Sequence, residues 1–277
     1  MFNEKFNLQF KTALITGAAG LLGEEHALAL LESDCNLILT DIKLEQLKEL
    51  KRRLLSKYSD SNIRVYELDV TSKDSILGLH KKLQKLGISI NILINNAALN
   101  PKVEKNYGNK SLKRFESFDL EDWNLELAVG LTGAFLCSQV FGSDMAKKRK
   151  GGCILNIASD LSVIAPDQRI YMKEKIEEEN QPVKPVTYSV IKTGIIGLTK
   201  YLATYWIGSN IRCNALSPGG IYTSQPDDFV IKLSNLIPLG RMAKKNEYRA
   251  AIQFLCSDAS SYLNGHNLVM DGGRSIW

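Results

Sequence analysis

The chain of 277 residues has few of the side chains that build metal centres and disulfide frameworks. Its three histidines, His26, His80 and His266, lie far apart in the sequence, so we expect no metal site. Its five cysteines are scattered, odd in number and never spaced as a CxxC pair. The N-terminus "MFNEKFNLQF" has no apolar run that would suit a signal peptide. We therefore interpret the cysteines as free thiols and expect a cytoplasmic protein.

Long hydrophobic runs and a strong charge of either sign are also missing. No window approaches about 18 consecutive apolar residues, so we expect no membrane-spanning helix. The formal net charge is +5, and the basic residues are dispersed. We interpret the one short basic cluster, "AKKRK" at 146–150, as a solvated helix end. We therefore expect neither a membrane nor a nucleic acid as partner.

Short apolar runs alternate with stretches of helical periodicity along the whole chain. We expect strands at 12–16, 36–40, 62–68, 90–96, 152–159, 210–217 and 267–273. We expect helices at 21–33, 43–58, 73–86 and 247–257, one around "VTYSVIKTG", and one from Asp119 towards Lys150 with a break at Gly130. Apolar strands separated by helices indicate a parallel sheet covered on both faces. No linker, repeat or change of composition divides the sequence, so we expect one domain.

The sequence "TGAAGLLG" lies between the first predicted strand and the first predicted helix. Gly17, Gly20 and Gly23 suit a turn whose backbone approaches a pyrophosphate at a helix N-terminus, where a side chain would be in the way. Asp41 ends the second strand, where a carboxylate accepts both ribose hydroxyls of an adenosine and repels a 2′-phosphate. An aspartate there can instead cap the helix that starts at Lys43. The two features together favour dinucleotide binding, and NAD rather than NADP.

The third and fourth predicted strands end in "LDVT" and "NNAAL", at what we expect to be the same edge of the sheet. Asp69 is placed to reach an adenine amino group, and Val70 to contribute backbone contacts. The alternative for Asp69 is a helix cap before "TSKDS". Asn95, Asn96 and Ala97 form a polar step of small residues, which by itself is weak evidence for a site.

The sequence "VTYSVIKTG" places Tyr188 and Lys192 four residues apart in a predicted helix, so they lie on one face. An ordinary surface pair has the same spacing. A free phenol has a pKa of about 10 and is a poor base at neutral pH. The positive charge of Lys192 would favour the phenolate, which makes the pair a candidate acid–base device.

In their order and spacing, these motifs resemble the short-chain dehydrogenase/reductases. The motifs span essentially the whole chain and are "TGAAGLLG", Asp41, "LDVT", "NNAAL", "NIAS", "YSVIK", "NALSPGGIYT" and "VMDGG". The resemblance implies one α/β domain of Rossmann type over residues 1–277, with a doubly wound, seven-stranded parallel sheet. It also implies a nicotinamide cofactor, a small-molecule substrate, hydride transfer between a secondary alcohol and a ketone, and assembly into a homodimer or homotetramer.

The resemblance assigns roles to individual residues. Tyr188 is the proton donor or acceptor, Lys192 also holds the nicotinamide ribose, and Ser159 at the end of "CILNIAS" binds and orients the reacting oxygen. The turn after "NALSPGG" presents backbone groups to the nicotinamide carboxamide. The expected cofactor contacts are Gly17, Ala19, Leu21, Leu22, Gly23, Asp41, Asp69, Val70, Asn96, Ala97, Ala98, Tyr188, Lys192, Pro218, Gly219, Ile221 and Thr223.

The sequence departs from the family pattern in three places. The glycines follow G-x-x-G-x-x-G, whereas compact members of the family mostly show G-x-x-x-G-x-G. Gly130 stands where the family has a helix asparagine that belongs to its proton relay. Ser159 and Tyr188 are 29 residues apart instead of about a dozen, which leaves an insertion at about 160–187 beside the substrate pocket.

Gly130 leaves two functions open. Glycine keeps the helix irregular and leaves room for a water, so we expect proton transfer through a longer water chain from Lys192. The alternative is a broken relay, in a dinucleotide-binding scaffold or sensor subunit that does not catalyse. Intact Ser159, Tyr188 and Lys192 favour the active enzyme.

The insertion offers the main clue to the substrate. We expect it to form a mobile wall or lid, with Arg169 facing the pocket and clamping a phosphate or carboxylate. We interpret its lysines, Lys173, Lys175 and Lys184, as part of a solvated face of mixed charge. The stretches "NNAALNPK", "APDQRIY", "LSPGGIYTSQP" and "SNLIPLGRM" resemble the flagellin-modification protein A type of oxidoreductase from bacterial sugar pathways. This resemblance suggests a sugar or sugar-phosphate substrate.

Overall fold

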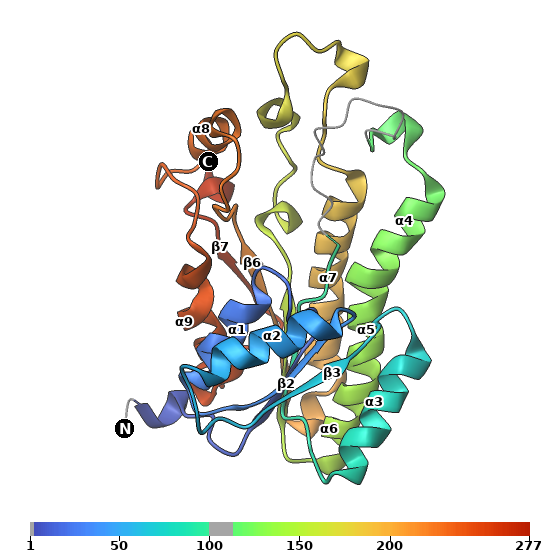
Figure 1. Ribbon diagram of the computed structural model, residues 1–277, viewed down its shortest axis with the longest axis vertical. Coiled ribbons are helices and arrows are strands. Elements are labelled where there is room, and N and C mark those ends of the chain that lie inside the picture. Colours follow the sequence, from blue (N-terminus) through green and yellow to red (C-terminus); the bar gives the residue numbers. More distant parts are fainter. Residues whose placement is uncertain (1–2, 100–112) are drawn as a thin grey trace.

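The computed structural model describes residues 3–99 and 113–277 (Figure 1). Within these ranges, seven parallel strands form one sheet in the order β3-β2-β1-β4-β5-β6-β7. The strands are β1 (Thr12–Ile15), β2 (Asn36–Asp41), β3 (Ile63–Glu67), β4 (Ile92–Asn95), β5 (Gly152–Ile157), β6 (Ile211–Pro218) and β7 (Asn267–Met270). The strand order reverses between β1 and β4, as in a doubly wound Rossmann-type sheet. The fold class expected from the sequence is therefore confirmed.

Helices cover both faces of the sheet, because successive strand side chains point into two different cores. Ala13 and Ile15 of β1 lie in one core, and Leu14 between them lies in the other. The first core is shared with α1 (Gly23–Leu31), α2 (Leu44–Leu55) and α9 (Arg249–Cys256). The second is shared with α3 (Lys73–Lys85), α5 (Gly133–Cys137), α6 (Ser143–Lys148) and α7 (Val186–Tyr205).

The helix from Leu120 to Lys148 is continuous, so the predicted break at Gly130 is wrong. It consists of α4 (Leu120–Leu127), α5 and α6, joined by π-helical turns at Ala128–Thr132 and Ser138–Gly142. Gly130 lies in the first π-helical turn, where an added Cβ would come within 2.8 Å of the Ile191 Cγ2 on α7. The helix is long and apolar enough to cross a membrane, but half of its apolar window is buried inside the protein, as in a core helix.

The insertion at 160–187 rises above the carboxyl edge of the sheet, near α8 (Asp227–Ser234), as Figure 1 shows. It consists of loops and short 3-10 turns at Asp160–Ser162, Gln168–Tyr171 and Glu178–Asn180. Ile170 anchors it in a small apolar core with Leu233, Ile237 and Met242. Neither α8 nor this core was expected from the sequence.

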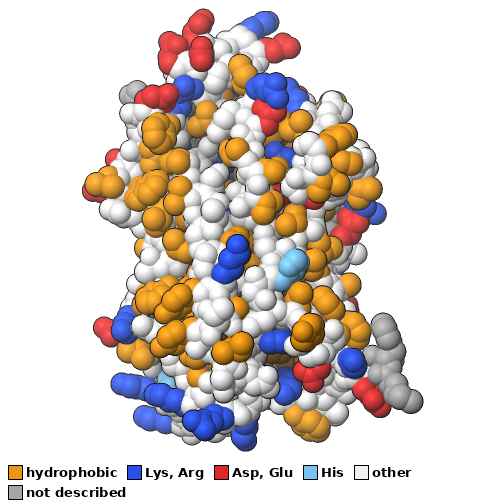
Figure 2. All heavy atoms as spheres, turned by 180° about the vertical axis from the view of Figure 1, so that it is seen from behind, with side chains coloured by type: hydrophobic (Ala, Val, Ile, Leu, Met, Phe, Trp, Pro, Cys, Tyr) orange, Lys and Arg blue, Asp and Glu red, His pale blue; other side chains and the backbone are white. Residues whose placement is uncertain are grey.

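Charged side chains gather at the two ends of the molecule, as seen in Figure 2. Residues 147–150, at the end of α6, are exposed, as expected for a solvated helix end. The opposite tip belongs to the insertion and carries exposed acidic residues, which are Glu174, Glu177, Glu178 and Glu179. Because α6 leads into the start of β5, the basic end lies at the amino edge of the sheet, opposite the carboxyl edge where the predicted site residues meet.

Candidate active site

The glycine-rich turn between β1 and α1 is held against the end of β4. Gly17 has a φ of +61°, and a Cβ at this position would come within 2.7 Å of the Ala97 Cα. A Cβ at Gly23 would overlap the Ala18 carbonyl group. The Asn96 Nδ2 donates a hydrogen bond to the Gly17 carbonyl oxygen at 2.9 Å, which fixes the turn. The turn thus needs glycine at both positions and keeps its backbone close to the carboxyl edge, which fits a pyrophosphate.

Asp41 ends β2 beside the same turn. Its Oδ2 accepts a hydrogen bond from the Ala19 N–H at 3.1 Å, and its Oδ1 accepts one from the Lys43 N–H at 3.0 Å. The second bond closes a short turn before α2, whose N-cap is Lys43, so Asp41 does not make the helix cap that the sequence left as an alternative; the first ties the carboxylate to the glycine turn. Each carboxylate oxygen has two lone pairs, so the carboxylate can also accept from ribose hydroxyls.

Asp69 and Val70 follow β3 at this edge. The Asp69 Oδ1 accepts hydrogen bonds from the N–H and the hydroxyl of Thr71, at 2.9 and 2.7 Å. The helix cap considered for Asp69 is made instead by Ser72, whose side chain accepts from the first turn of α3. Val70 packs against Gly133, where a Cβ would come within 2.8 Å of the valine Cγ2.

The remaining predicted cofactor contacts lie along the same edge. Ala19, Leu21 and Leu22 belong to the glycine turn, and Ala98 follows β4. Beyond it, residues 100–102 of the "NNAALNPK" stretch lie outside the described residues.

The turn after β6 completes the carboxyl edge, and it starts with Pro218, the last residue of the strand. A Cβ at Gly219 would come within 2.7 Å of the Asp271 Cα, so no side chain fits there. Ile221 forms an isolated bridge with Ala243, and Thr223 follows two residues later. This part of the site is therefore held by the segment after β7.

Ser159, Tyr188 and Lys192 converge on this edge from β5 and α7. Ser159 lies two residues after β5, and the other two lie one turn apart near the start of α7. The Lys192 Nζ donates a hydrogen bond to the Ile157 carbonyl oxygen at 2.8 Å and lies 5.8 Å from the centroid of the Tyr188 ring. The Ser159 side chain lies near enough to the Tyr188 hydroxyl to lower its pKa. Lys192 is buried and Tyr188 is half-buried, so the two do not form an ordinary surface pair.

Burial dominates the protonation of these groups. It raises the pKa of the Tyr188 hydroxyl, an effect that the Ser159 side chain opposes and the charge of Asp160 reinforces. Burial also lowers the pKa of Lys192 to about 8, and the positive charge of Lys184 adds to this shift. The sequence led us to expect that Lys192 favours the phenolate. In the structure, burial has the largest effect on the Tyr188 hydroxyl, and the phenol is the favoured form at neutral pH.

Lys184 is a residue of this site that the sequence analysis placed on the solvated face. Its Nζ lies 3.7 Å from the centroid of the Tyr188 ring, within the range of a cation–π contact. Burial lowers the pKa of Lys184 to about 8, although the charges of Asp160 and Glu126 act in the opposite direction. Lys184 lies before Pro185, the N-cap of α7, so helical spacing does not relate it to Tyr188, and the sequence offered no signal for this contact.

Arg169 does not face the site, in contrast to the expectation from the sequence. Its side chain is 83% exposed, and its guanidinium holds Asp167 with two hydrogen bonds, from Nε at 2.9 Å and from Nη2 at 2.7 Å. The aspartate two residues earlier gives the guanidinium a local bidentate partner, which is the physical reason for this placement. Lys184 takes its place as the cation of the insertion that approaches Tyr188.

Below the site, a chain of polar side chains crosses the core. The Asn95 Nδ2 donates to the Ser138 Oγ at 3.0 Å and to the Asn156 Oδ1 at 2.8 Å. The Asn156 Nδ2 in turn donates to the Thr199 Oγ1 at 2.9 Å. This chain joins β4, the second π-helical turn, β5 and α7, and so fixes the elements that carry the site. The water chain expected near Gly130 stays a prediction.

The chain also carries cysteine and histidine side chains away from this site. Across the described ranges, no three His, Cys, Asp or Glu side chains are grouped so as to hold a metal ion. All five cysteines are buried, and burial raises the pKa of Cys35 and of Cys137 to about 12. Burial also lowers the pKa of His26 to about 4. The thiols of Cys35 and Cys137 therefore stay protonated at neutral pH and are not nucleophiles.

The fold and the site together define a Rossmann-type oxidoreductase that uses a nicotinamide dinucleotide. The family described as enoyl-(acyl carrier protein) reductase matches residues 17–275. An NAD-dependent glycerol dehydrogenase of Listeria innocua is 32% identical over 280 residues, which cover 99% of this chain and 98% of the relative.

Two solved structures are similar over their whole length. A short-chain type dehydrogenase/reductase from Mycobacterium marinum has a TM-score of 0.83 at 27% identity, with 99% of this chain and 98% of that chain covered. A gluconate 5-dehydrogenase from Burkholderia cenocepacia, in complex with NADP and tartrate, has a TM-score of 0.84 at 25% identity, with 100% of both chains covered. The chain belongs to the short-chain dehydrogenase/reductase family, and it acts as an oxidoreductase on CH–OH groups of small molecules.

Proposed function

We propose that the protein is an NAD-dependent dehydrogenase that interconverts a secondary alcohol and a ketone on a sugar-like or polyol substrate. The observation that carries the proposal is the convergence of Ser159, Tyr188 and Lys192 at the edge that also holds the open glycine turn. The similarity to a glycerol dehydrogenase and to a gluconate 5-dehydrogenase supports the substrate class.

The residues present fit a dinucleotide. The turn at Gly17 would hold its pyrophosphate, Asp41 its adenosine ribose, and Lys192 its nicotinamide ribose. When bound, this cofactor accepts or supplies the hydride. The glycine positions support the fit most strongly, because a side chain at Gly17 would meet the Ala97 backbone.

Tyr188 moves the proton. In alcohol oxidation its phenolate takes the hydroxyl proton of the substrate, and in ketone reduction its phenol returns that proton. Ser159 holds the reacting oxygen beside Tyr188 through its hydroxyl. Because burial raises the pKa of Tyr188, the oxidation rate rises with pH until the phenolate forms, whereas reduction uses the form that is present at neutral pH.

Asp41 selects NAD in this proposal. A 2′-phosphate would meet a carboxylate that is already held in place by the N–H groups of Ala19 and Lys43, so it would be repelled. One relative is named NAD-dependent and one similar structure is a complex with NADP, so measurement has to decide. Separate titrations with NADH and NADPH should give the smaller dissociation constant for NADH. Tighter binding of NADPH contradicts the assignment.

The direct test of the activity is the formation of NADH from NAD and a panel of polyols and sugar acids, which includes glycerol, threitol and gluconate. Turnover of at least one member is expected. NADH binding without turnover of any member would instead favour the non-catalytic scaffold that Gly130 left open. A Gly130→Asn variant separates a lost relay from a working one: no gain in turnover is expected if water already completes the relay, and a large gain would favour the non-catalytic scaffold.

We also propose that the protein forms a homodimer or homotetramer through α4 to α6 and α7. These helices expose large apolar side chains, including Leu125 at 53%, Phe135 at 46% and the stacked pair Tyr201 and Tyr205 at 60% and 63%. Burial of such side chains in an interface is favourable. Light scattering after size exclusion should give a multiple of the 30.9 kDa chain mass, and a Tyr201→Glu variant should reduce it. A monomeric parent contradicts the proposal.

A further inference from the structure

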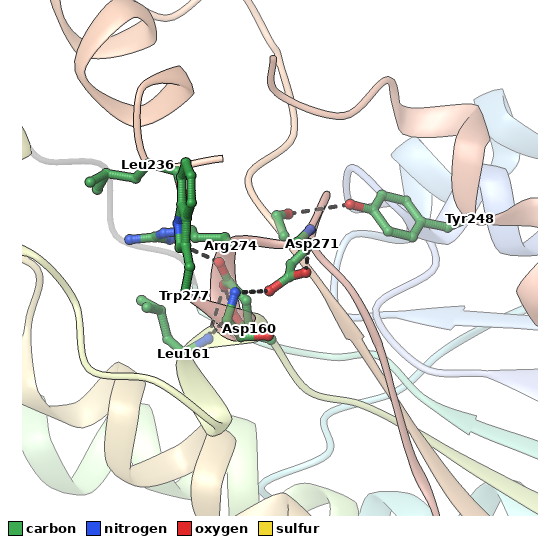
Figure 3. Close-up of polar contacts among 11 residues, drawn as sticks. Asp160, Leu161, Leu236, Tyr248, Asp271, Arg274 and Trp277 are labelled. Carbon is green, nitrogen blue, oxygen red and sulfur yellow. Dashed lines mark hydrogen bonds and ion pairs between the residues drawn. The ribbon is translucent and has the colours of Figure 1, made fainter. Parts of the chain in front are cut away.

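A buried ion pair between Asp160 and Arg274 (Figure 3) is hydrogen-bonded to the candidate catalytic serine. The Arg274 Nη1 donates a hydrogen bond to the Asp160 Oδ2 at 2.8 Å, and the two side chains are 8% and 5% exposed. The other carboxylate oxygen of Asp160 accepts from the Ser159 hydroxyl at 2.8 Å and from the Leu161 N–H at 2.9 Å. One carboxylate thus connects the serine to an arginine near the C-terminus.

The segment after β7 holds this arginine in place. The Asp271 side chain accepts from the Gly273 N–H at 2.9 Å and from the Ser275 N–H at 2.7 Å, so Arg274 lies inside a closed turn. The Trp277 Nε1 donates to the Leu236 carbonyl oxygen at 3.1 Å and fastens the end of the chain. The guanidinium therefore reaches Asp160 from a pre-formed turn, in the arrangement that Figure 3 shows.

Stability alone does not account for such a pair. A buried ion pair loses much of its Coulomb attraction to desolvation, and apolar residues of similar volume are often as stabilising. What the pair does provide is a fixed orientation for the Ser159 hydroxyl. The Asp160 carboxylate and the Leu161 N–H, which lies 3.2 Å from the Ser159 Oγ, fix the Ser159 hydroxyl in one position, from which its proton turns to the reacting oxygen when substrate binds.

The pair also contributes to the charge around Tyr188. Asp160 lies on the β5 side and raises the pKa of the tyrosine, as does the burial of the ring. Lys184 approaches from the insertion and Lys192 from α7, and both are cations. The Tyr171 hydroxyl of the insertion also faces this group, and Arg274 acts on it from the C-terminal turn. Because the Arg274 guanidinium lies 2.8 Å from the Asp160 carboxylate, we expect its positive charge to limit the effect of Asp160 on Tyr188.

We propose that Asp160 and Arg274 form a positioning pair, through which the C-terminal turn orients Ser159 and sets the electrostatic environment of Tyr188. The proposal rests on the dehydrogenase activity proposed above. It makes the last turn of the chain part of the active site, although none of its side chains contacts Tyr188 directly. It also predicts opposite effects for the two members of the pair, which a purely structural role does not.

The test compares pH profiles of substrate oxidation for Asp160→Asn, Arg274→Gln and Arg274→Lys. Removal of the negative charge in Asp160→Asn should move the midpoint to lower pH by about one unit, since a nearby charge shifts a buried group by roughly that amount. Arg274→Gln leaves the carboxylate without its counter-charge and should move the midpoint to higher pH by about one unit. Arg274→Lys keeps the charge and should stay near the parent.

A matched control is Arg212→Gln. Arg212 donates to backbone carbonyl oxygens of Leu255, Ser257 and Leu263, and it lies at the start of β6, at the opposite edge of the sheet. This variant should lose stability and keep the parent midpoint. If Arg274→Gln does not fold, the comparison of Asp160→Asn with Arg274→Lys still decides, because only the first should shift.

A readout without turnover separates this inference from the proposed function. Tyrosinate absorbance of each protein, minus that of the same protein with Tyr188→Phe, follows the titration of Tyr188 in the presence of NAD. The midpoint of the Tyr188 titration should move to lower pH in Asp160→Asn and to higher pH in Arg274→Gln. If they occur and no polyol is turned over, the proposed function fails and the positioning pair stands. Shifts in the same direction for Asp160→Asn and Arg274→Gln, or no shift in either, overturn the pair.

Discussion

The cofactor side and the substrate side of this site are built in different ways. On the cofactor side, the main feature is the absence of side chains: Gly17 brings its backbone against Ala97, and the Asn96 amide fixes the turn. On the substrate side, buried charges meet around Tyr188, including Lys184 and Lys192, both with a pKa of about 8. The first side therefore depends on shape, and the second on electrostatics that water does not screen.

The largest expected effect lies on the substrate side. Lys192→Met removes the cation that holds the nicotinamide ribose and lies one turn from Tyr188, so turnover should fall by at least about a hundredfold and NADH should bind more weakly. Lys200→Met, an exposed lysine on the same helix, is the control and should change neither quantity. Turnover measured at saturating substrate decides, and near-parent turnover in Lys192→Met contradicts the assignment.

On the cofactor side, the sharpest change is a single methyl group. Gly17→Ala combines a positive φ with a Cβ that meets the Ala97 backbone, so the turn has to move and NADH affinity should fall by about tenfold or more. Gly87→Ala is the matched control, because its φ is also positive at +67° but nothing lies within 4 Å. The positive φ should cost both variants about 1–2 kcal/mol of stability, and the clash adds to this loss in Gly17→Ala. Equal NADH affinities in the two variants would show that shape does not govern this side.

A smaller effect is expected for Arg169, an exposed cation of the insertion. Arg169→Ala should leave KM within about twofold of the parent, because the guanidinium is exposed and already holds Asp167. This reverses what the sequence predicted for Arg169. Kinetics with the substrate found in the panel give the result, and a large rise in KM would restore Arg169 to the site.

The smallest effect is on stability. Lys184 has a folded pKa of about 8, below the ordinary lysine pKa of 10.5, so the unfolded chain binds more protons between these pH values. The free energy of unfolding therefore gains a contribution as pH rises through this window. In Lys184→Met that gain is lost. Denaturant titrations at pH 8 and pH 10 should show the parent-minus-variant difference becoming more positive, whereas a flat or falling difference would mean that Lys184 is solvated.

The part of the molecule that could be predicted from sequence is the part that local patterns encode. The seven strands appear as buried apolar runs, and the glycine turn and Asp41 follow from their place at strand ends. The break expected at Gly130 is a π-helical turn instead, because the helix stays continuous while glycine lets it pack against Ile191.

The rest of the site depends on contacts that no local pattern specifies. Asp160 and Arg274 are 114 residues apart in the sequence, and their pairing requires β5 and the turn after β7 to be placed first. Lys184 was missed because it was grouped with the other lysines of the insertion, whereas in space its Nζ lies over the Tyr188 ring. The raised pKa of Tyr188 has the same origin, since burial rather than the adjacent lysine decides it.

The central claim is that Tyr188 is the acid–base group of a working NAD-dependent dehydrogenase. It is tested most directly by NADH formation in the parent and in Tyr188→Phe, measured side by side with NADH affinity. The substitution removes only a hydroxyl, so we expect turnover to fall by at least about a hundredfold while NADH binds as in the parent. Turnover retained in Tyr188→Phe, with unchanged NADH affinity, would contradict this account.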